Sequence, residues 1–146
     1  MPDSFCGAIP DDRLYDPKFD MWVRHDADGY VTLGATAFGL FLAGEIIMFT
    51  GKPRGAEVAR GRGIGTVETG KTVLAVHAPI SVVNLQCNDA AEDQPRIINK
   101  FPYDEGWLAK AHAASWLSEL SLLVDAAAYR QHILSINPTA RFVTNS

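Results

Sequence analysis

The chain has 146 residues, enough for one domain with a modest core, and its 47% apolar and 21% charged residues are ordinary for a globular protein. The formal net charge of −4 provides no basic surface, so we expect no nucleic-acid partner and no attraction to an anionic membrane. The N-terminus is acidic and lacks an apolar run, and no apolar stretch is long enough to cross a bilayer, which together predict a cytoplasmic protein.

The start of the chain predicts a loosely ordered lead-in followed by a hairpin. Residues 1–18 are rich in aspartate and proline, which favour irregular structure. Residues 21–23 and 30–34 have the composition of short strands. We expect them to pair through Asp28-Gly29, a dipeptide favoured in tight hairpin turns.

A short helix and a buried strand are expected next. Residues 36–44 are mainly apolar and predict a short helix. Thr36 is a favoured N-cap for its start, and Gly44 is a favoured residue for its end. Residues 45–49 form an almost continuous apolar run, which predicts a buried strand.

From residue 57 onward β character dominates. Closely spaced glycines before residue 66 break any helix and allow bends. Two β-rich runs follow and are separated by Pro79. In the second run Val83, Leu85 and Cys87 alternate with polar residues, the period of a half-buried strand. A last strand is expected near residues 107–110.

The end of the chain has a helical period. Apolar residues recur at spacings of three and four over residues 114–136, which predicts an amphipathic helix lying across the β body and ended by Asn137-Pro138. Residues 137–146 are expected to fray. The predicted domain is therefore residues 19–136, a mostly β fold with short helices and a C-terminal amphipathic helix.

The string GTVETGKT at residues 65–72 admits two incompatible interpretations. It fits the P-loop pattern G-x-x-x-x-G-K-[ST], but a P-loop also needs a buried strand before it and a helix beginning at Lys71-Thr72. The preceding residues are polar and broken by glycines, and the following ones are β-branched and meet Pro79. We therefore favour a β-hairpin with Lys71 at its tip and Gly70 supplying a positive φ. A nucleotide-binding protein remains the remote alternative.

A lysine at a hairpin tip stays outside the core, so its amine can reach an activated carboxyl group as a free nucleophile. Residue chemistry alone favours the simpler interpretation, that Lys71 is an ordinary solvated turn residue. Glu68, three residues earlier, is on the same grounds a solvated strand carboxylate. A β domain that acts only as a binding module, without modification, is a further alternative.

The hairpin resembles the lipoyl-attachment hairpin of lipoyl domains, and most closely that of the glycine cleavage H-protein family, with Glu68 and Lys71 at the positions of its glutamate and lipoyl-lysine. This resemblance covers about residues 19–134 and implies a lipoyl-type flattened β-barrel or sandwich (a barrel-sandwich hybrid). Outside the hairpin it includes an early strand, an asparagine-rich segment before a Pro-Tyr-x-x-Gly-Trp motif, and a closing helix. The matching residues are Gly34, Thr36, Gly55, Asn88, Pro95, Asn99, Pro102, Tyr103, Gly106 and Trp107.

Several positions depart from the family pattern. Asp20 stands where H proteins usually have a histidine close to the docked arm, residues 81–83 replace a serine-glycine-glutamate, and Thr69-Gly70 replaces a serine-valine. The residues that flank Lys71 are not methionines, which argues against biotin. With its Gly70-Lys71 pair, the pattern is more similar to the H-protein-like lipoate-binding proteins linked to bacterial sulfur oxidation.

The resemblance implies a carrier and not an enzyme. A lipoate–protein ligase or lipoyl transferase would join lipoate to Lys71 through an amide, with Glu68 and Gly70 beside it. The arm would carry a sulfur-bound intermediate and electrons between enzymes, with a heterodisulfide-reductase-like complex as the expected partner. The alternative is glycine cleavage, in which an aminomethyl group passes from glycine decarboxylase to aminomethyltransferase and dihydrolipoyl dehydrogenase reoxidises the arm.

Two further side chains, Cys6 and His77, are candidates for a role beside the arm, although an incidental cysteine and an ordinary strand histidine are the simpler interpretations. Cys6 and Cys87 are far apart and lack metal-type spacing, so we expect neither a disulfide scaffold nor a metal site. Cys87 is predicted to fill the core, whereas Cys6 is predicted to be exposed. His77, on the strand after the tip, would lie close to a docked dithiolane if the arm folds back along that strand.

Overall fold

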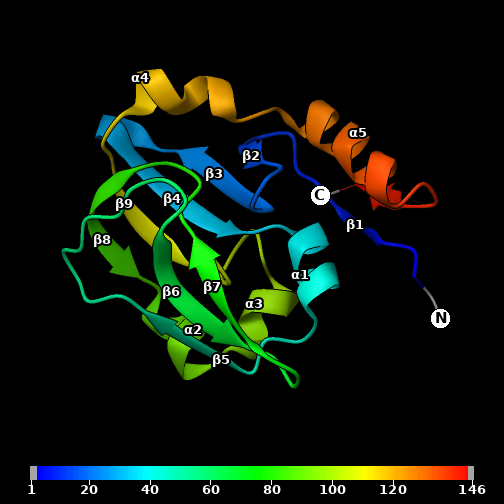
Figure 1. The fold of residues 1–146 in the computed structure, drawn as a ribbon, viewed down its shortest axis with the longest axis horizontal. Coiled ribbons are helices and arrows are strands. Elements are labelled where there is room, and N and C mark those ends of the chain that lie inside the picture. Colours follow the sequence, from blue (N-terminus) through cyan, green and yellow to red (C-terminus); the bar gives the residue numbers. More distant parts are fainter. Residues whose placement is uncertain (1–2, 145–146) are drawn as a thin grey trace.

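The computed structural model describes residues 3–144, which form three β-sheets with short helices around them (Figure 1). A five-stranded antiparallel sheet has the order β2-β3-β4-β9-β8, with bounds Leu14–Asp16, Met21–His25, Tyr30–Ala35, Ala109–Ala113 and Val82–Cys87. A three-stranded antiparallel sheet contains β5 (Met48–Gly51), β6 (Gly63–Glu68) and β7 (Val73–His77). Near the two termini, β1 (Cys6–Ala8) and β10 (Arg141–Val143) form a parallel pair.

The helices are short and connect the strands. They are α1 (Ala37–Ala43), α2 (Asp89–Asp93), α3 (Arg96–Lys100), α4 (Trp116–Glu119) and α5 (Ala126–Ile136), with the 3-10 turns η1 (Ala27–Gly29) and η2 (Leu120–Leu122). The expected mostly β fold with short helices and a C-terminal helix is confirmed. The predicted ends of α1 are also confirmed. At its start Thr36 Oγ1 accepts a hydrogen bond from the Gly39 amide, and at its end Gly44 has a φ of +98°.

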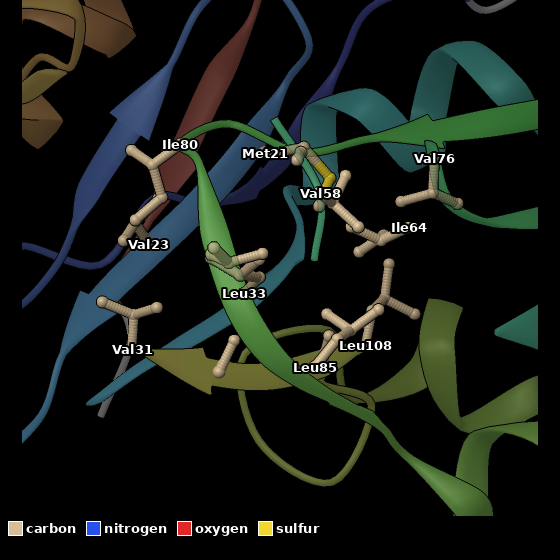
Figure 2. Close-up of a cluster of buried hydrophobic side chains, with 14 of the residues drawn as sticks. Met21, Val23, Val31, Leu33, Val58, Ile64, Val76, Ile80, Leu85 and Leu108 are labelled. Carbon is tan, nitrogen blue, oxygen red and sulfur yellow. The ribbon is translucent and has the colours of Figure 1, made fainter. Parts of the chain in front are cut away.

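The main core lies between the five-stranded and three-stranded sheets (Figure 2). Because successive side chains of a strand point to opposite faces, Met21 and Val23 on β3 enter this core while Trp22 points the other way. Leu33 on β4 and Ile64 on β6 belong to the same core. Burial of each such side chain contributes about 1.5–3 kcal/mol to holding the two sheets together.

A second core covers the outer face of the five-stranded sheet. Trp22 is fully buried there against Phe38 of α1 and Tyr129 and Ile133 of α5. Gly34 is the register partner of Trp22 on the neighbouring strand. A Cβ at position 34 would lie 2.3 Å from Cε2 of the indole, so only glycine leaves room for the ring.

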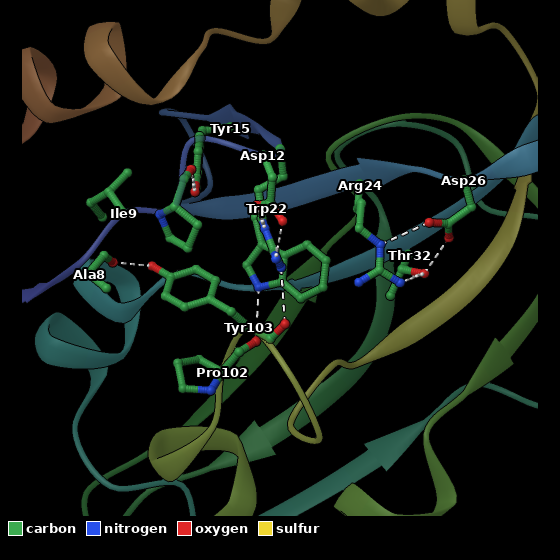
Figure 3. Close-up of polar contacts among 12 residues, drawn as sticks. Ala8, Ile9, Asp12, Tyr15, Trp22, Arg24, Asp26, Thr32, Pro102 and Tyr103 are labelled. Carbon is green, nitrogen blue, oxygen red and sulfur yellow. Dashed lines mark hydrogen bonds and ion pairs between the residues drawn. The ribbon is translucent and has the colours of Figure 1, made fainter. Parts of the chain in front are cut away.

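Buried polar contacts tie the loop before β9 to the sheet and to α1 (Figure 3). The Trp22 indole donates a hydrogen bond to the Pro102 carbonyl (3.0 Å), and Arg13 donates to the Tyr103 carbonyl (3.1 Å). The Tyr103 hydroxyl donates to the Ala8 carbonyl (2.6 Å) and accepts from the first amide of α1 (3.0 Å). These bonds fix α1, which forms one wall of the candidate site.

The predicted single helix over residues 114–136 is wrong. The segment contains α4 and η2, then an extended stretch in which Val124 exchanges two backbone hydrogen bonds of 2.8 Å with Tyr15, and only then α5. Asp125 starts α5, because its side chain accepts a hydrogen bond from the Ala128 amide. An N-cap inside the apolar period therefore divides the segment.

The expected loosely ordered lead-in and fraying tail are also wrong within the described residues. Residues 1–18 contain β1 and β2, and Phe5 and Tyr15 are buried. The tail forms β10, which pairs with β1. A strand of three residues is too short to show a hydrophobic periodicity in the sequence. These strands form because they pair with partners in the folded protein. Four residues of these two predictions lie outside the described residues: Met1, Pro2, Asn145 and Ser146.

The predicted buried strand at residues 45–49 is wrong in its bounds and burial. β5 begins only at Met48, and Ile47 and Met48 are exposed. Ile46 is buried, but its amide donates to Asn99 Oδ1 (2.8 Å) instead of to a neighbouring strand. The segment is a connection at the edge of the three-stranded sheet, with Ile46 as its anchor.

The other strand predictions are close to the structure. β3 and β4 pair through Asp28-Gly29, whose φ values of +59° and +79° fit a tight hairpin, and β7 and β8 lie on either side of Pro79. Leu85 is buried as expected, but a register shift between Val83 and Gln86 disturbs the alternation of β8. The last strand, β9, begins two residues later than expected.

Candidate functional site

The lysine singled out in the sequence lies at the tip of the β6–β7 hairpin. The two strands pair antiparallel up to Glu68 opposite Val73, so residues 69–72 form the turn. Lys71 is exposed, and within residues 3–144 the structure records no hydrogen bond or ion pair of its side chain. Its amine is therefore available to an external acylating agent.

A threonine organises the turn. The Thr69 amide donates to the Thr72 carbonyl (2.9 Å), and the buried Thr69 hydroxyl accepts from the amides of Lys71 (3.2 Å) and Thr72 (3.3 Å). The expectation that Gly70 supplies a positive φ is wrong, because its φ is not in the left-handed region. Position 70 is open as well: an added Cβ would meet nothing within 4 Å.

The geometry of this turn predicts different effects for substitutions at the two residues before Lys71, Thr69 and Gly70. Thr69→Ala removes the acceptor of two turn amides, so we expect the free energy of unfolding to fall by about 1 kcal/mol and hydrogen exchange at Lys71 and Thr72 to accelerate. Gly70→Ala is the matched control and should leave stability unchanged or raise it by up to about 1 kcal/mol. Urea unfolding measures the stability of both variants, and amide exchange measures the protection of the turn. A loss of stability larger for Gly70→Ala than for Thr69→Ala would contradict this account of the turn.

The P-loop interpretation is excluded by the same geometry. A P-loop lysine is followed by a helix whose N-terminal amides face the phosphates. Here the chain continues from Thr72 into β7, which runs antiparallel to β6. No helix begins at this lysine, and the nucleotide-binding alternative is wrong.

Exposed apolar side chains surround the hairpin tip. Glu68, half-buried, is the register partner of Met48 on one side and Val73 on the other, and its carbonyl accepts from the Ile47 amide (2.8 Å). We call the tip collar the four apolar residues next to it with 39–59% exposure: Ile47, Met48, Val73 and Leu74. Apolar groups gathered around a reactive side chain are typical of a surface that partners contact.

A cavity of about 310 Å³ opens beside the hairpin, and we call it the arm cavity. Its walls are β7, α1 and the turn that leads into β3. Leu74, the third residue after Lys71, belongs to its lining, so the cavity adjoins the tip. Among its lining residues only Asp20 and His77 have polar side chains. The cavity is thus a mostly apolar space beside the hairpin that displays the lysine.

Asp20 and His77 are held in fixed orientations. Asp20 accepts a hydrogen bond from the Tyr129 hydroxyl (2.7 Å); burial raises the pKa of its carboxyl, and this hydrogen bond opposes the rise. His77 Nδ1 lies 2.8 Å from the Gly61 carbonyl and so carries the proton of that contact, and its ring stacks on Phe19 at 4.9 Å. Sequence reasoning noted Asp20 and His77 but missed Tyr129, which is far away in the chain.

The two cysteines are not part of the arm cavity. Cys6 is exposed on β1 as expected. Cys87 is half-buried against Gly51, and burial raises the pKa of its thiol to about 11. Within residues 3–144 no group of three or more histidine, cysteine, aspartate or glutamate side chains is placed to hold a metal ion. The described helices are all too short or too polar to cross a membrane.

Comparison with known proteins identifies the family. The sequence model described as "Glycine cleavage H-protein" matches residues 13–136. The chain belongs to the glycine cleavage H-protein family. It is 37% identical over 125 residues to the glycine cleavage system H protein of Marinobacter nauticus. The aligned region covers 86% of this chain and 95% of the Marinobacter protein. It is 38% identical over 117 residues to glycine cleavage system H protein 2 of Aquifex aeolicus, covering 80% and 73%.

A solved H protein has the same fold. The crystal structure of a glycine cleavage system H protein from Mycobacterium marinum superposes with a TM-score of 0.71 at 29% identity, covering 86% of this chain and 98% of the other. Proteins of the H-protein family are lipoyl carriers without enzymatic activity of their own, and they typically carry lipoate on a lysine. The chain is therefore an H-protein-family carrier.

Proposed function

We propose that Lys71 is the lipoylated residue and that the protein is the carrier of a glycine cleavage system, shuttling an aminomethyl group. The observation that carries the proposal is an exposed lysine at a hairpin tip, with no side-chain partner among residues 3–144, adjoining an apolar cavity in a chain of the H-protein family. The relatives at 32–38% identity are named glycine cleavage system H proteins. The proposed location is the cytoplasm.

The residues at the site fit a lipoyl group. A lysine lengthened by an eight-carbon acyl chain reaches roughly 14 Å from its Cα, and Leu74, three residues further along the chain, is at most about 10 Å from Lys71. The arm can thus reach the arm cavity, whose lining is mostly apolar like the acyl chain. Once bound, lipoate supplies a dithiolane whose two sulfurs undergo thiol–disulfide exchange.

Each part of the site then has a task. Lys71 provides the amine for the amide bond, and Thr69 holds the turn that displays it. The hairpin tethers the arm, which gives it a high effective concentration at any docked partner. The tip collar contacts the ligase or transferase and the partner enzymes, with Glu68 and Gly70 next to the lysine. The arm cavity shields the end of the arm from water between encounters.

Reconstitution tests this function. The lipoylated protein is mixed with glycine decarboxylase, aminomethyltransferase and dihydrolipoyl dehydrogenase from Marinobacter nauticus, and exchange of labelled carbon dioxide into glycine is measured. We expect exchange that depends on this protein and is absent with Lys71→Arg. A protein fully lipoylated by mass that supports no exchange would refute the glycine cleavage role.

A carrier role in heterodisulfide-reductase-like sulfur oxidation is the second candidate. The Gly70-Lys71 pair and Asp20 in place of the usual histidine favour it. Two relatives in Aquifex aeolicus are numbered 2 and 5, so one organism has several H-type chains, which leaves room for specialised ones. We rank it second because the relatives are named for glycine cleavage.

A further inference from the structure

Two segments outside the family match come together beside α1. The family model covers residues 13–136, and the structure brings residues 3–8 and 137–143, from either side of that stretch, into one small unit. Its two strands, β1 and β10, pair in parallel (Figure 1). We call residues 3–8 and 137–143 the terminal clasp. Because the clasp lies outside the matched stretch, its role does not follow from the family.

Hydrogen bonds join the two parts of the clasp. The Arg141 amide donates to the Phe5 carbonyl (2.8 Å), and the Phe5 amide donates to Asn137 Oδ1 (3.0 Å). Asn137 also donates through Nδ2 to the Asp3 carbonyl (2.7 Å). A pair of three-residue strands near the termini opens at a lower free energy than the large sheets do. The elements that pack on the clasp therefore determine what opens with it.

Phe5 attaches the clasp to α1. Its side chain is buried, with 2% exposure. Its ring meets Phe38 of α1 edge-on with 5.4 Å between the centroids, and Phe41 of α1 at 5.6 Å. On the other strand of the clasp, the ring of Phe142 lies 6.2 Å from it. Aromatic pairs at these distances attract one another, so a single ring joins β1, β10 and α1.

α1 lies between the clasp and the arm cavity. Successive residues of a helix are turned by about 100°, so Phe38 and Phe41 share one face of α1. The α1 residues that line the cavity are Gly39, Leu40, Leu42 and Ala43. Their mean direction around the helix axis is nearly opposite to that of the two phenylalanines. Since the cavity leaves packing incomplete on its side of α1, the contact with the clasp carries a large share of what holds the helix in place.

The clasp and α1 also share a fixed point. The Tyr103 hydroxyl donates to the carbonyl of Ala8, the last residue of β1, and accepts from the amide of Ala37, the first residue of α1 (2.6 and 3.0 Å). Directly after β1, Arg130 of α5 donates to the Ile9 carbonyl (2.9 Å). Both elements are therefore anchored at one end beside Tyr103, and Phe5 joins them away from that anchor.

We propose that the terminal clasp holds α1 against the body of the protein, so that the clasp and α1 open together while the two large sheets stay folded. Phe5 is the positioning residue that couples them. Opening removes one wall of the arm cavity and exposes its contents to solvent or to a partner. The coupled opening is a property of this fold, and only its effect on a lipoyl arm rests on the proposed function.

Native-state hydrogen exchange on the full, unlipoylated chain measures this coupling. The reporters are the amides of Leu40 and Gly44, which bond within α1 and its N-cap, and of Arg141, which bonds across the clasp. We expect these three amides to share one opening free energy, below that of the amides between β4 and β9. The β4 and β9 amides report whether the five-stranded sheet stays folded.

A disulfide across the clasp is the closing test. Arg141→Cys places a second thiol opposite Cys6, its exposed register partner, on a strand about 4.8 Å away, a spacing that a disulfide spans. Oxidised glutathione converts the two thiols to a disulfide and is itself reduced to two thiols. Cys87 does not compete, because it is half-buried and the pKa of its thiol is raised to about 11. We expect the disulfide to slow exchange at Leu40 and Gly44 at least about tenfold relative to the same variant after reduction.

Phe5→Ala is the opening test and needs no disulfide. It should accelerate exchange at Leu40, Gly44 and Arg141 at least about tenfold, with the β4 and β9 amides still the slower ones. Phe5→Leu keeps an apolar side chain and should restore most of the protection. The control is Val58→Ala, at a buried main-core residue outside the clasp, α1 and the cavity lining. It should lower the stability measured by urea and leave the three reporters unchanged.

Two results would overturn the inference. If Val58→Ala accelerates the α1 amides as much as Phe5→Ala does, α1 opens only by global unfolding. If the disulfide protects residue 141 and leaves exchange at Leu40 and Gly44 unchanged, α1 opens without the clasp. Neither result bears on acylation of Lys71, since both are measured on the unmodified chain. Conversely, a Lys71 that no ligase acylates would refute the proposed function and leave the coupled opening measurable.

Discussion

Lys71→Arg should abolish lipoylation completely. The protein is produced with lipoate and a lipoate–protein ligase, and intact-mass spectrometry should show one added lipoyl group on the unsubstituted chain and none on the variant. The reason is chemical: a guanidinium keeps the positive charge and the length of the side chain but stays protonated, so it offers no nucleophilic amine. Since the side chain has no recorded partner within residues 3–144, the fold should not change.

The matched control is Lys52→Arg. Lys52 is also exposed and directly follows β5, the neighbour of β6 in the three-stranded sheet, so it samples a similar surface without lying in the hairpin turn. It should be lipoylated to the same extent as the unsubstituted chain. A lipoyl group retained in Lys71→Arg, or lost in Lys52→Arg, would place the modification elsewhere. An unmodified protein across several ligases would favour the binding-module alternative.

The features that sequence reasoning located are those encoded by neighbouring residues. The β6–β7 hairpin follows from β-branched residues on both sides of a polar turn, and α1 follows from Thr36 and Gly44 at its ends. The β3–β4 hairpin follows from Asp28-Gly29 between two β-rich runs. Each of these signals lies in residues that are close together in the sequence, so it can be recognised without knowledge of tertiary contacts.

The features that sequence reasoning missed depend on distant partners. Three-residue strands such as β1 and β10 exist only because they pair with each other across the chain. The carboxyl of Asp20 is set by Tyr129, more than a hundred residues away. Asp125 was readable as an N-cap, but the uninterrupted apolar period of three and four concealed it. Local sequence patterns were therefore enough to locate the lysine. The residues that form the wall of the neighbouring cavity could be identified only from the folded structure.

Gly34→Ala should cost several kcal/mol of stability although it adds a single methyl group. The new Cβ would lie 2.3–2.5 Å from three atoms of the Trp22 ring, far inside van der Waals contact. Trp22 is fully buried and its indole nitrogen donates to the Pro102 carbonyl (3.0 Å), so the ring can move aside only by disturbing its packing and breaking this hydrogen bond. Overpacking typically costs about 1–3 kcal/mol, and loss of a buried indole hydrogen bond adds about 1–3 kcal/mol.

A double-mutant cycle attributes this loss to the ring. In a Trp22→Phe background the smaller side chain leaves space beside position 34, so Gly34→Ala should cost at least about 1 kcal/mol less there than in the unsubstituted chain. Urea unfolding gives the four free energies. Gly70→Ala serves as the control for a glycine with open space around it and should not couple to Trp22. Equal costs of Gly34→Ala in both backgrounds would mean that the backbone of β4, and not the fit of the indole against it, requires glycine at this position.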